Sequence, residues 1–245
     1  MTEHNVYNLS LEDLTLCKKK KGKTNQLIFG VMLVHFKKYV QFPSNKANTI
    51  PTQLLLQVAN HLDLDQIHVL SFDWNARSGE RYRQEIRQYL GYRVTNAEDI
   101  ALIINYLVDN LIPRHLSDSV LLEQTRLYFA KNKIEIVSTK QLEHYILLAS
   151  QKFEQQFLGK IFDNLNQEDL LLIDRILSKD SNKDHDVIDL AELKQDIAGA
   201  KIKNVQDAID KINLLGQIKL SDSIVDSVDR KLLFKYYERV MAFAP

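Results

Sequence analysis

Helical periodicity is the feature that most restricts the fold of this chain. Between Asn96 and Pro113, apolar residues recur at the spacing of one helix face, in the series Ile100, Ile103, Ile104, Leu107, Val108 and Leu111. Asn96 is a typical N-cap residue, and Pro113 cannot continue a helix. The 245 residues include only seven glycines and four prolines, whereas strand-rich folds use more of these residues in turns. The pattern therefore predicts an all-α protein.

The same periodicity predicts helices along most of the chain. They are expected at 11–18 behind a Ser10 cap, from Thr24 or Asn25 onward, from Pro51 onward, at 78–90 with Ser78 as the cap, at 118–131, from 139 to about 158, and at 167–177, 190–198, 205–215 and 229–242. A short helix, a basic turn and a second helix occur twice, near 11–38 and near 118–158. This order is typical of helix-turn-helix modules. The polar stretch 178–186 is the most linker-like part of the sequence.

Positive charge is concentrated in the first part of the chain. The formal net charge is zero, but residues 1–94 contain 13 Lys and Arg against 8 Asp and Glu. Residues 95–245 contain 19 against 24. Because the net charge alone argues neither for nor against a polyanionic partner, this distribution is the informative quantity.

Cysteine usage and hydropathy predict a cytoplasmic protein without membrane contact. Cys17 is the only cysteine, which excludes an intrachain disulfide and a cysteine-based zinc site and suits a reducing compartment. The longest apolar run, Leu27 to Val34, is too short to cross a bilayer. The N-terminus also lacks the basic-then-apolar order of a signal peptide.

The most unusual stretch is CKKKKGKTNQ, residues 17–26. Its Gly-Lys-Thr resembles the end of a P-loop, but that loop needs a glycine where Cys17 stands and follows a strand. A nuclear import signal and a merely solvated turn are further alternatives. We favour a turn that faces phosphate groups, because its lysines combine with the open amides of a helix N-terminus. The candidate DNA-binding residues are Lys18, Lys19, Lys20, Lys21, Lys23, Thr24, Asn25 and Gln26, the last two as possible readers of base edges.

A second candidate is the stretch 74–93, in which arginines alternate with aromatic residues. Arginine suits forked contacts to phosphate or to guanine edges. The candidates there are Arg77, Ser78, Arg81 and Arg83. The alternative is an amphipathic helix that buries Ile86 and pairs its arginines with Glu80 and Glu85.

The sequence shows no recognisable catalytic, cofactor-binding or metal-binding motif. Residues 180–192 resemble a calcium loop, but His185 stands where a glycine is needed and Ala191 where a bidentate glutamate is needed. His35 lies on an apolar helix face and is expected to be a hydrogen-bonded core residue. We therefore expect no enzyme activity, metal or cofactor.

Five segments, in this order, resemble the N-terminal region of the replicative, bacterial Tn-three family transposases. They are LSLEDLTLCKKKKGKTNQLIFGVMLVHFKKYVQFP, IPTQLLLQVANHLDL, RSGERYRQEIRQYLGYRV, KNKIEIVSTKQLEHYI and DLAELKQDIAGAKIKNVQDAIDKINLLGQIKL. Together they cover roughly residues 8–245. In that family the region is helical and binds the terminal inverted repeats of the transposon, and the RNase H-like catalytic core lies far downstream.

The resemblance implies a DNA-recognition fragment, either an excised domain or a truncated reading frame. It implies a first DNA-binding helical module at 1–70, a second at 71–150 and a helical linker domain at 151–245. The second module would add Lys131, Lys133, Thr139 and Lys140 to the arginines above. Double-stranded inverted-repeat DNA is the expected partner, and self-association is possible through the full-length protein. One alternative function is a helical protein-interaction scaffold within a transposition complex, without direct DNA contact, and another is a complete enzyme of an unrecognised type.

Overall fold

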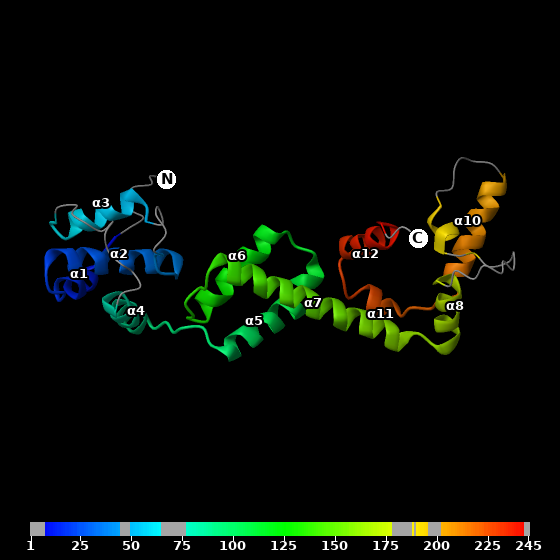
Figure 1. Ribbon diagram of the computed structural model, residues 1–245, viewed down its shortest axis with the longest axis horizontal. Coiled ribbons are helices and arrows are strands. Elements are labelled where there is room, and N and C mark those ends of the chain that lie inside the picture. The colour runs from blue at the N-terminus through cyan, green and yellow to red at the C-terminus, as the bar shows by residue number, and fades with distance from the viewer. Residues whose placement is uncertain are drawn as a thin grey trace. The chain divides into compact units, whose positions relative to one another are not determined.

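The computed structural model describes residues 8–44, 50–64, 77–177, 188, 190–195 and 202–242, and it confirms the all-α class (Figure 1). Within these residues the regular elements are helices, and one isolated bridge pairs Arg93 with Ile134. The helices are α1 (Leu11–Lys18), α2 (Lys23–Tyr39), α3 (Thr52–His61), α4 (Arg77–Leu90), α5 (Ala97–Asn110), the 3-10 helix η3 (Ile112–Arg114), α6 (Asp118–Lys131), α7 (Thr139–Asn164), α8 (Gln167–Leu177), α9 (Leu190–Lys194), α10 (Ile202–Leu215), α11 (Asp222–Val225) and α12 (Arg230–Ala242). In the described part of the chain, none of these helices combines the length and the apolar character needed to span a membrane.

The chain packs into two compact units. Unit 1 comprises residues 1–103 and 119–145, and unit 2 comprises residues 104–118 and 146–245. The sequence predicted domain boundaries after residues 70 and 150. Those boundaries separate proposed DNA-binding modules rather than packing units, so they stay a prediction. Within unit 1, α4 shares one hydrophobic core with α1, α2 and α3.

Helix α2 is the centre of the core of unit 1. Its residues from Leu27 to Phe36 are all buried, and it packs against α1, α3 and α4, with α3 above and α4 below it in Figure 1. Gly30 is required by the close approach of α3, since a Cβ atom there would lie 2.8 Å from Cγ1 of Val58. On the side of α4, the rings of Phe29 and Tyr82 meet edge to face at 5.4 Å.

A capping box fixes the start of α1 and places a buried carboxylate between three helices. The Ser10 hydroxyl accepts a hydrogen bond from the Asp13 amide at 3.2 Å, and Asp13 Oδ2 accepts one from the Ser10 amide at 2.7 Å. Asp13 also accepts hydrogen bonds from Lys37 Nζ of α2 at 2.6 Å and from the Tyr89 hydroxyl of α4 at 3.1 Å. Burial opposes ionisation of this carboxyl, but the bonds from Lys37 and Ser10 outweigh it and lower its pKa.

The second helix-turn-helix pair, α6 and α7, is joined by an extended turn that packs on the end of α2. The amide of Ile136 donates to the Val40 carbonyl at 2.8 Å, and Gln41 Nε2 donates to the Val137 carbonyl at 3.1 Å. Ser138 caps α7 in a box with Gln141. The two basic turns predicted from the sequence therefore belong to one unit.

Most helix bounds follow the sequence prediction, and the differences have local causes. Helix α2 begins at Lys23, because Gly22 adopts a φ of +88° and can serve as the N-cap. Ser78 lies inside α4 rather than at its cap, and α7 continues beyond residue 158 to Asn164. The linker-like stretch 178–186 lies outside the described residues, and so do residues 180–187 and 189 of the calcium-loop-like stretch.

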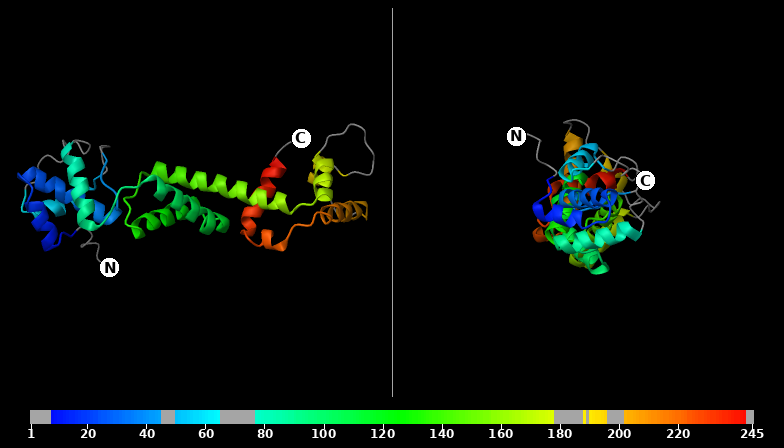
Figure 2. Two further views of the ribbon diagram at one scale, coloured as in Figure 1. Left: turned by 90° about the horizontal axis from the view of Figure 1, so that it is seen from below. Right: turned by 90° about the vertical axis from the view of Figure 1, so that its left-hand side faces the viewer.

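Unit 2 contains residues 104–118, which include η3, and the helices from residue 146 of α7 to α12. Figures 1 and 2 both draw α12 beside this half of α7, where the rings of Phe157 and Tyr236 stack at 6.0 Å. Arg239 of α12 donates to Glu154 of α7 at 2.7 Å. These contacts fix one face of α12 on the unit.

Candidate nucleic-acid interface

The turn between α1 and α2 presents lysine side chains to solvent. We call residues 18–23 the lysine turn. Lys18, Lys19, Lys21 and Lys23 are exposed, and none of them forms an ion pair with a described carboxylate. The first turn of α2 contains no acidic residue, so the partial positive charge of the helix N-terminus adds to that of the lysines.

Lys20 differs from its neighbours because it points into the unit. Its side chain is only 11% exposed, forms an ion pair with Glu85 of α4, and lies 4.2 Å from the ring centroid of Phe29. The sequence predicted a phosphate contact for all the lysines of the turn. In this structure Lys20 instead connects the turn to α4, and we leave it out of the interface proposed below.

The amide side chains of Asn25 and Gln26 fold back onto the lysine turn. Asn25 Nδ2 donates to the Lys21 carbonyl at 2.8 Å, and Gln26 Nε2 donates to the Lys20 carbonyl at 3.1 Å. These hydrogen bonds brace the lysine turn. Thr24 beside them is exposed.

Helix α4 has one buried face and one polar face. Tyr82 and Ile86 are buried in the core. On the opposite side Arg77, Arg81, Gln84 and Gln88 are exposed and follow each other at i, i+4, i+7 and i+11, which places them along one stripe. We call these four residues the α4 stripe. Gln84 and Gln88 were not among the residues predicted from the sequence, although their helical spacing from Arg77 and Arg81 was a usable signal.

The lysine turn contacts α4 through Lys20. The Lys20 ammonium is 5.7 Å from the Tyr82 ring centroid, and the Arg81 guanidinium is 5.6 Å from the same centroid. The ion pair between Lys20 and Glu85 holds the lysine turn against α4. The exposed lysines Lys18, Lys19, Lys21 and Lys23, together with the α4 stripe, are called the turn-α4 surface below.

The other residues predicted on α4 are engaged within the protein. The Arg83 guanidinium lies 3.4 Å from Glu80 and 5.9 Å from the Phe42 ring centroid, and Ser78 is half-buried. One turn further, Arg87 is buried and donates to Glu135 at 2.8 Å. Burial raises the pKa of Glu135, and the hydrogen bond from Arg87 opposes that rise. The pair between Arg87 and Glu135 joins α4 to the second basic turn.

The second basic turn lies at the C-terminal end of α4. The amide of Arg93, just after α4, donates to the Lys133 carbonyl at 3.0 Å, and the Lys133 ammonium lies 4.6 Å from the Tyr92 ring centroid. Lys131 and Lys140 are exposed. The hydroxyl of Thr139 accepts a hydrogen bond from Arg126 at 2.7 Å. The structure thus brings the lysine turn to the middle of α4, and it brings the second basic turn to the C-terminal end of α4.

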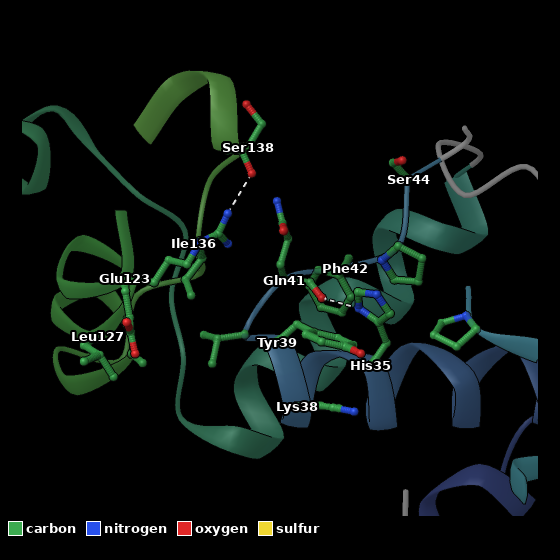
Figure 3. Close-up of a pocket in the computed structure, with 16 residues that line it drawn as sticks. His35, Lys38, Tyr39, Gln41, Phe42, Ser44, Glu123, Leu127, Ile136 and Ser138 are labelled. Carbon is green, nitrogen blue, oxygen red and sulfur yellow. Dashed lines mark hydrogen bonds between the residues drawn. The ribbon is translucent and has the colours of Figure 1, made fainter. Parts of the chain in front are cut away.

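An open groove of 710 Å³ lies between the end of α2 and the start of α7 (Figure 3). His35 lines it and is buried, with Nδ1 at 2.6 Å from the Gln41 carbonyl, as Figure 3 shows. Burial is the main cause that lowers the pKa of His35, which favours the neutral ring with a proton on Nδ1. This agrees with the expected core histidine. Because Glu123 also lines the groove beside Lys38 and Arg126, its charge is mixed and gives no preference for an anion.

Comparison with known families identifies the first part of the chain. A family model described as "Domain of unknown function (DUF4158)" matches residues 3–149, which is more than half of the sequence. The chain belongs to the DUF4158 family. No curated protein matches it with significant similarity.

The DUF4158 match includes α1, α2, the turn-α4 surface, α6 and the first part of α7. It begins before α1 and ends within α7. Unit 2 lies mostly beyond the matched residues.

Lys19 and Lys20 of the DUF4158 domain are expected to respond differently to substitution. Lys20→Ala removes the pair with Glu85 and the contact with Phe29, and should lower the free energy of unfolding by about 1–2 kcal/mol. Lys19→Ala should change it by less than about 0.5 kcal/mol, because the side chain is exposed. Urea denaturation of the two variants measures the difference. Equal stabilities would contradict the inward role of Lys20.

Proposed function

We propose that this chain binds duplex DNA through the turn-α4 surface, as the N-terminal recognition part of a Tn-three family transposase. Its target is the terminal inverted repeat of the transposon, and the catalytic core belongs to a part of the transposase outside this chain. One observation carries the proposal. Exposed lysines at an open helix N-terminus flank Lys20 in the sequence, and Lys20 pairs with Glu85 of α4, the helix that carries an exposed stripe of arginines and glutamines.

The lysine turn supplies phosphate contacts. Lysine ammonium groups and the free amides at the start of α2 both favour anions, and this combination commonly holds a helix-turn-helix on the DNA backbone. Because residues 27–36 of α2 are buried, its middle cannot enter a groove of the duplex, and the proposed contact is made by its first turn. Helix α2 therefore positions the protein through its N-terminus.

The α4 stripe supplies the base contacts. Arginine forms paired hydrogen bonds with guanine, and glutamine does so with adenine, in the major groove. Arg77, Arg81, Gln84 and Gln88 offer both types of side chain on one exposed helix face. Phosphate contacts from the adjacent lysines would hold this face against the groove.

Family membership supports the same function. Domains of the DUF4158 family typically occur in Tn-three family transposases. The five segments that resemble the N-terminal region of those transposases include both the lysine turn and α4. Lys131, Lys133 and Lys140, at the other end of α4, are proposed as further phosphate contacts on the same unit.

A binding assay with two duplexes tests the proposal. Fluorescence anisotropy would compare the inverted repeat of the encoding element with a scrambled duplex of equal length. The wild-type chain should prefer the inverted repeat, and Gln84→Ala should reduce that preference by about tenfold, because alanine cannot form the paired hydrogen bonds to a base.

Gln156→Ala, an exposed glutamine on α7, is the matched control and should leave the preference unchanged. Equal affinity of the wild-type chain for both duplexes would contradict sequence-specific recognition. Absence of binding to either duplex would favour the protein-interaction scaffold instead.

A further inference from the structure

Helix α12 of unit 2 carries a second cationic surface, outside the residues that match the DUF4158 family. Arg230, Lys231, Phe234, Lys235 and Glu238 line a hollow of 670 Å³, together with His115, which follows η3. None of these residues belongs to the turn-α4 surface. The charge of the hollow is positive, since a single carboxylate, that of Glu238, faces the three Arg and Lys side chains that line it.

The α12 surface is held in place from its opposite face. The amide of Asp229 donates to the Pro113 carbonyl at 2.9 Å, and its carboxylate accepts from the Lys231 amide at 2.8 Å. Leu232 is buried, Tyr236 stacks on Phe157, and Arg239 pairs with Glu154. The remaining face of α12 is therefore presented to solvent by a fixed helix.

An exposed aromatic residue stands at the centre of this cationic face. Phe234 is 58% exposed, and Tyr237, at 55%, lies 5.8 Å from it between ring centroids. Helical spacing places Arg230 one turn before Phe234, with Lys231 and Lys235 along one side of it. A large aromatic ring in water carries an unfavourable hydration free energy, which a stacked ligand would relieve.

We infer that α12 binds single-stranded DNA. Unpaired bases would stack on Phe234 and Tyr237, and the phosphodiester groups would contact Arg230, Lys231 and Lys235. Cations that follow the backbone, combined with aromatic rings that accept any base, are the combination that single-strand binding requires. A duplex keeps its bases stacked inside and offers such rings no partner. Binding of unpaired DNA by α12 would extend the proposed function beyond duplex recognition. The α12 surface belongs to unit 2, whereas the turn-α4 surface belongs to unit 1.

The test measures the anisotropy of a fluorescent oligothymidylate with the whole chain. Binding should weaken as salt rises, and Phe234→Ala should weaken it by about tenfold or more. The double variant Lys231→Ala/Lys235→Ala should reduce the log-log salt slope by about 1.4, because each neutralised phosphate of a single strand accounts for about 0.7. Both variants should keep the duplex affinity of the wild-type chain.

Two controls separate this inference from the proposed function. Phe162→Ala removes a ring of similar exposure, 62%, on α7 and should leave oligothymidylate binding unchanged. The triple variant Lys18→Ala/Lys19→Ala/Lys21→Ala should lose duplex affinity and retain oligothymidylate binding. Absence of oligothymidylate binding, or equal reductions in Phe234→Ala and Phe162→Ala, would overturn the inference. Duplex recognition by unit 1 would stand in either case.

Discussion

Replacing Lys18, Lys19 and Lys21 together by alanine should weaken duplex binding by about 10² to 10³-fold at about 0.1 M salt. Each lysine that binds a phosphate releases condensed counterions and adds about 0.9 to the slope of log affinity against log salt. Removing three such lysines should therefore flatten the slope by roughly 2 to 3. Anisotropy titrations across a salt series give both quantities.

The control for the lysine variant is a triple variant with the same change in net charge. Lys160, Lys219 and Lys231 are exposed lysines of unit 2, and their replacement by alanine should leave the duplex slope close to that of the wild type. Because long-range attraction depends on total charge, the two triple variants share that effect. If both flatten the slope equally, the lysine turn makes no specific phosphate contact.

Phe29→Ala should have the largest effect on stability and lower the free energy of unfolding of unit 1 by about 3–5 kcal/mol. Phe29 is fully buried, and its ring contacts both Tyr82 and the Lys20 ammonium. The substitution leaves a cavity at the point where α2, α4 and the lysine turn meet. DNA affinity should therefore fall together with stability.

Hydrogen exchange of the α2 amides measures this destabilisation, because it reports on unit 1 alone. Leu11→Ala is the matched control, since Leu11 is 84% exposed on α1 and should change protection by less than about 0.5 kcal/mol. Similar protection in Phe29→Ala and wild-type protein would show that α2 is not the centre of a cooperative core.

Capping residues made many helices predictable from the sequence. Ser10 and Asn96 each stand before an acidic residue that completes a capping box, with Asp13 and Asp99, and apolar spacing does the rest. The start of α2 was harder to predict from the sequence, because a glycine with positive φ can cap a helix without any side-chain signal. The short α11 has too few residues for a periodic pattern.

The candidate interface was only partly predictable, because side-chain direction depends on distant residues. Four consecutive lysines look alike in the sequence, and only the position of Phe29, Tyr82 and Glu85 turns Lys20 inward. The glutamines of α4 carry no charge and so did not stand out beside the arginines. Their exposure follows from the burial of Tyr82 and Ile86 on the opposite face of α4.

Site-specific crosslinking determines which surface of the protein faces the DNA. A photoreactive phenylalanine derivative would replace Gln84 in the α4 stripe or, as the control, Phe162 on α7. With the inverted-repeat duplex, we expect a crosslink from position 84 and none from position 162. A crosslink from position 162 with none from position 84 would contradict it, because the duplex would then lie away from the turn-α4 surface.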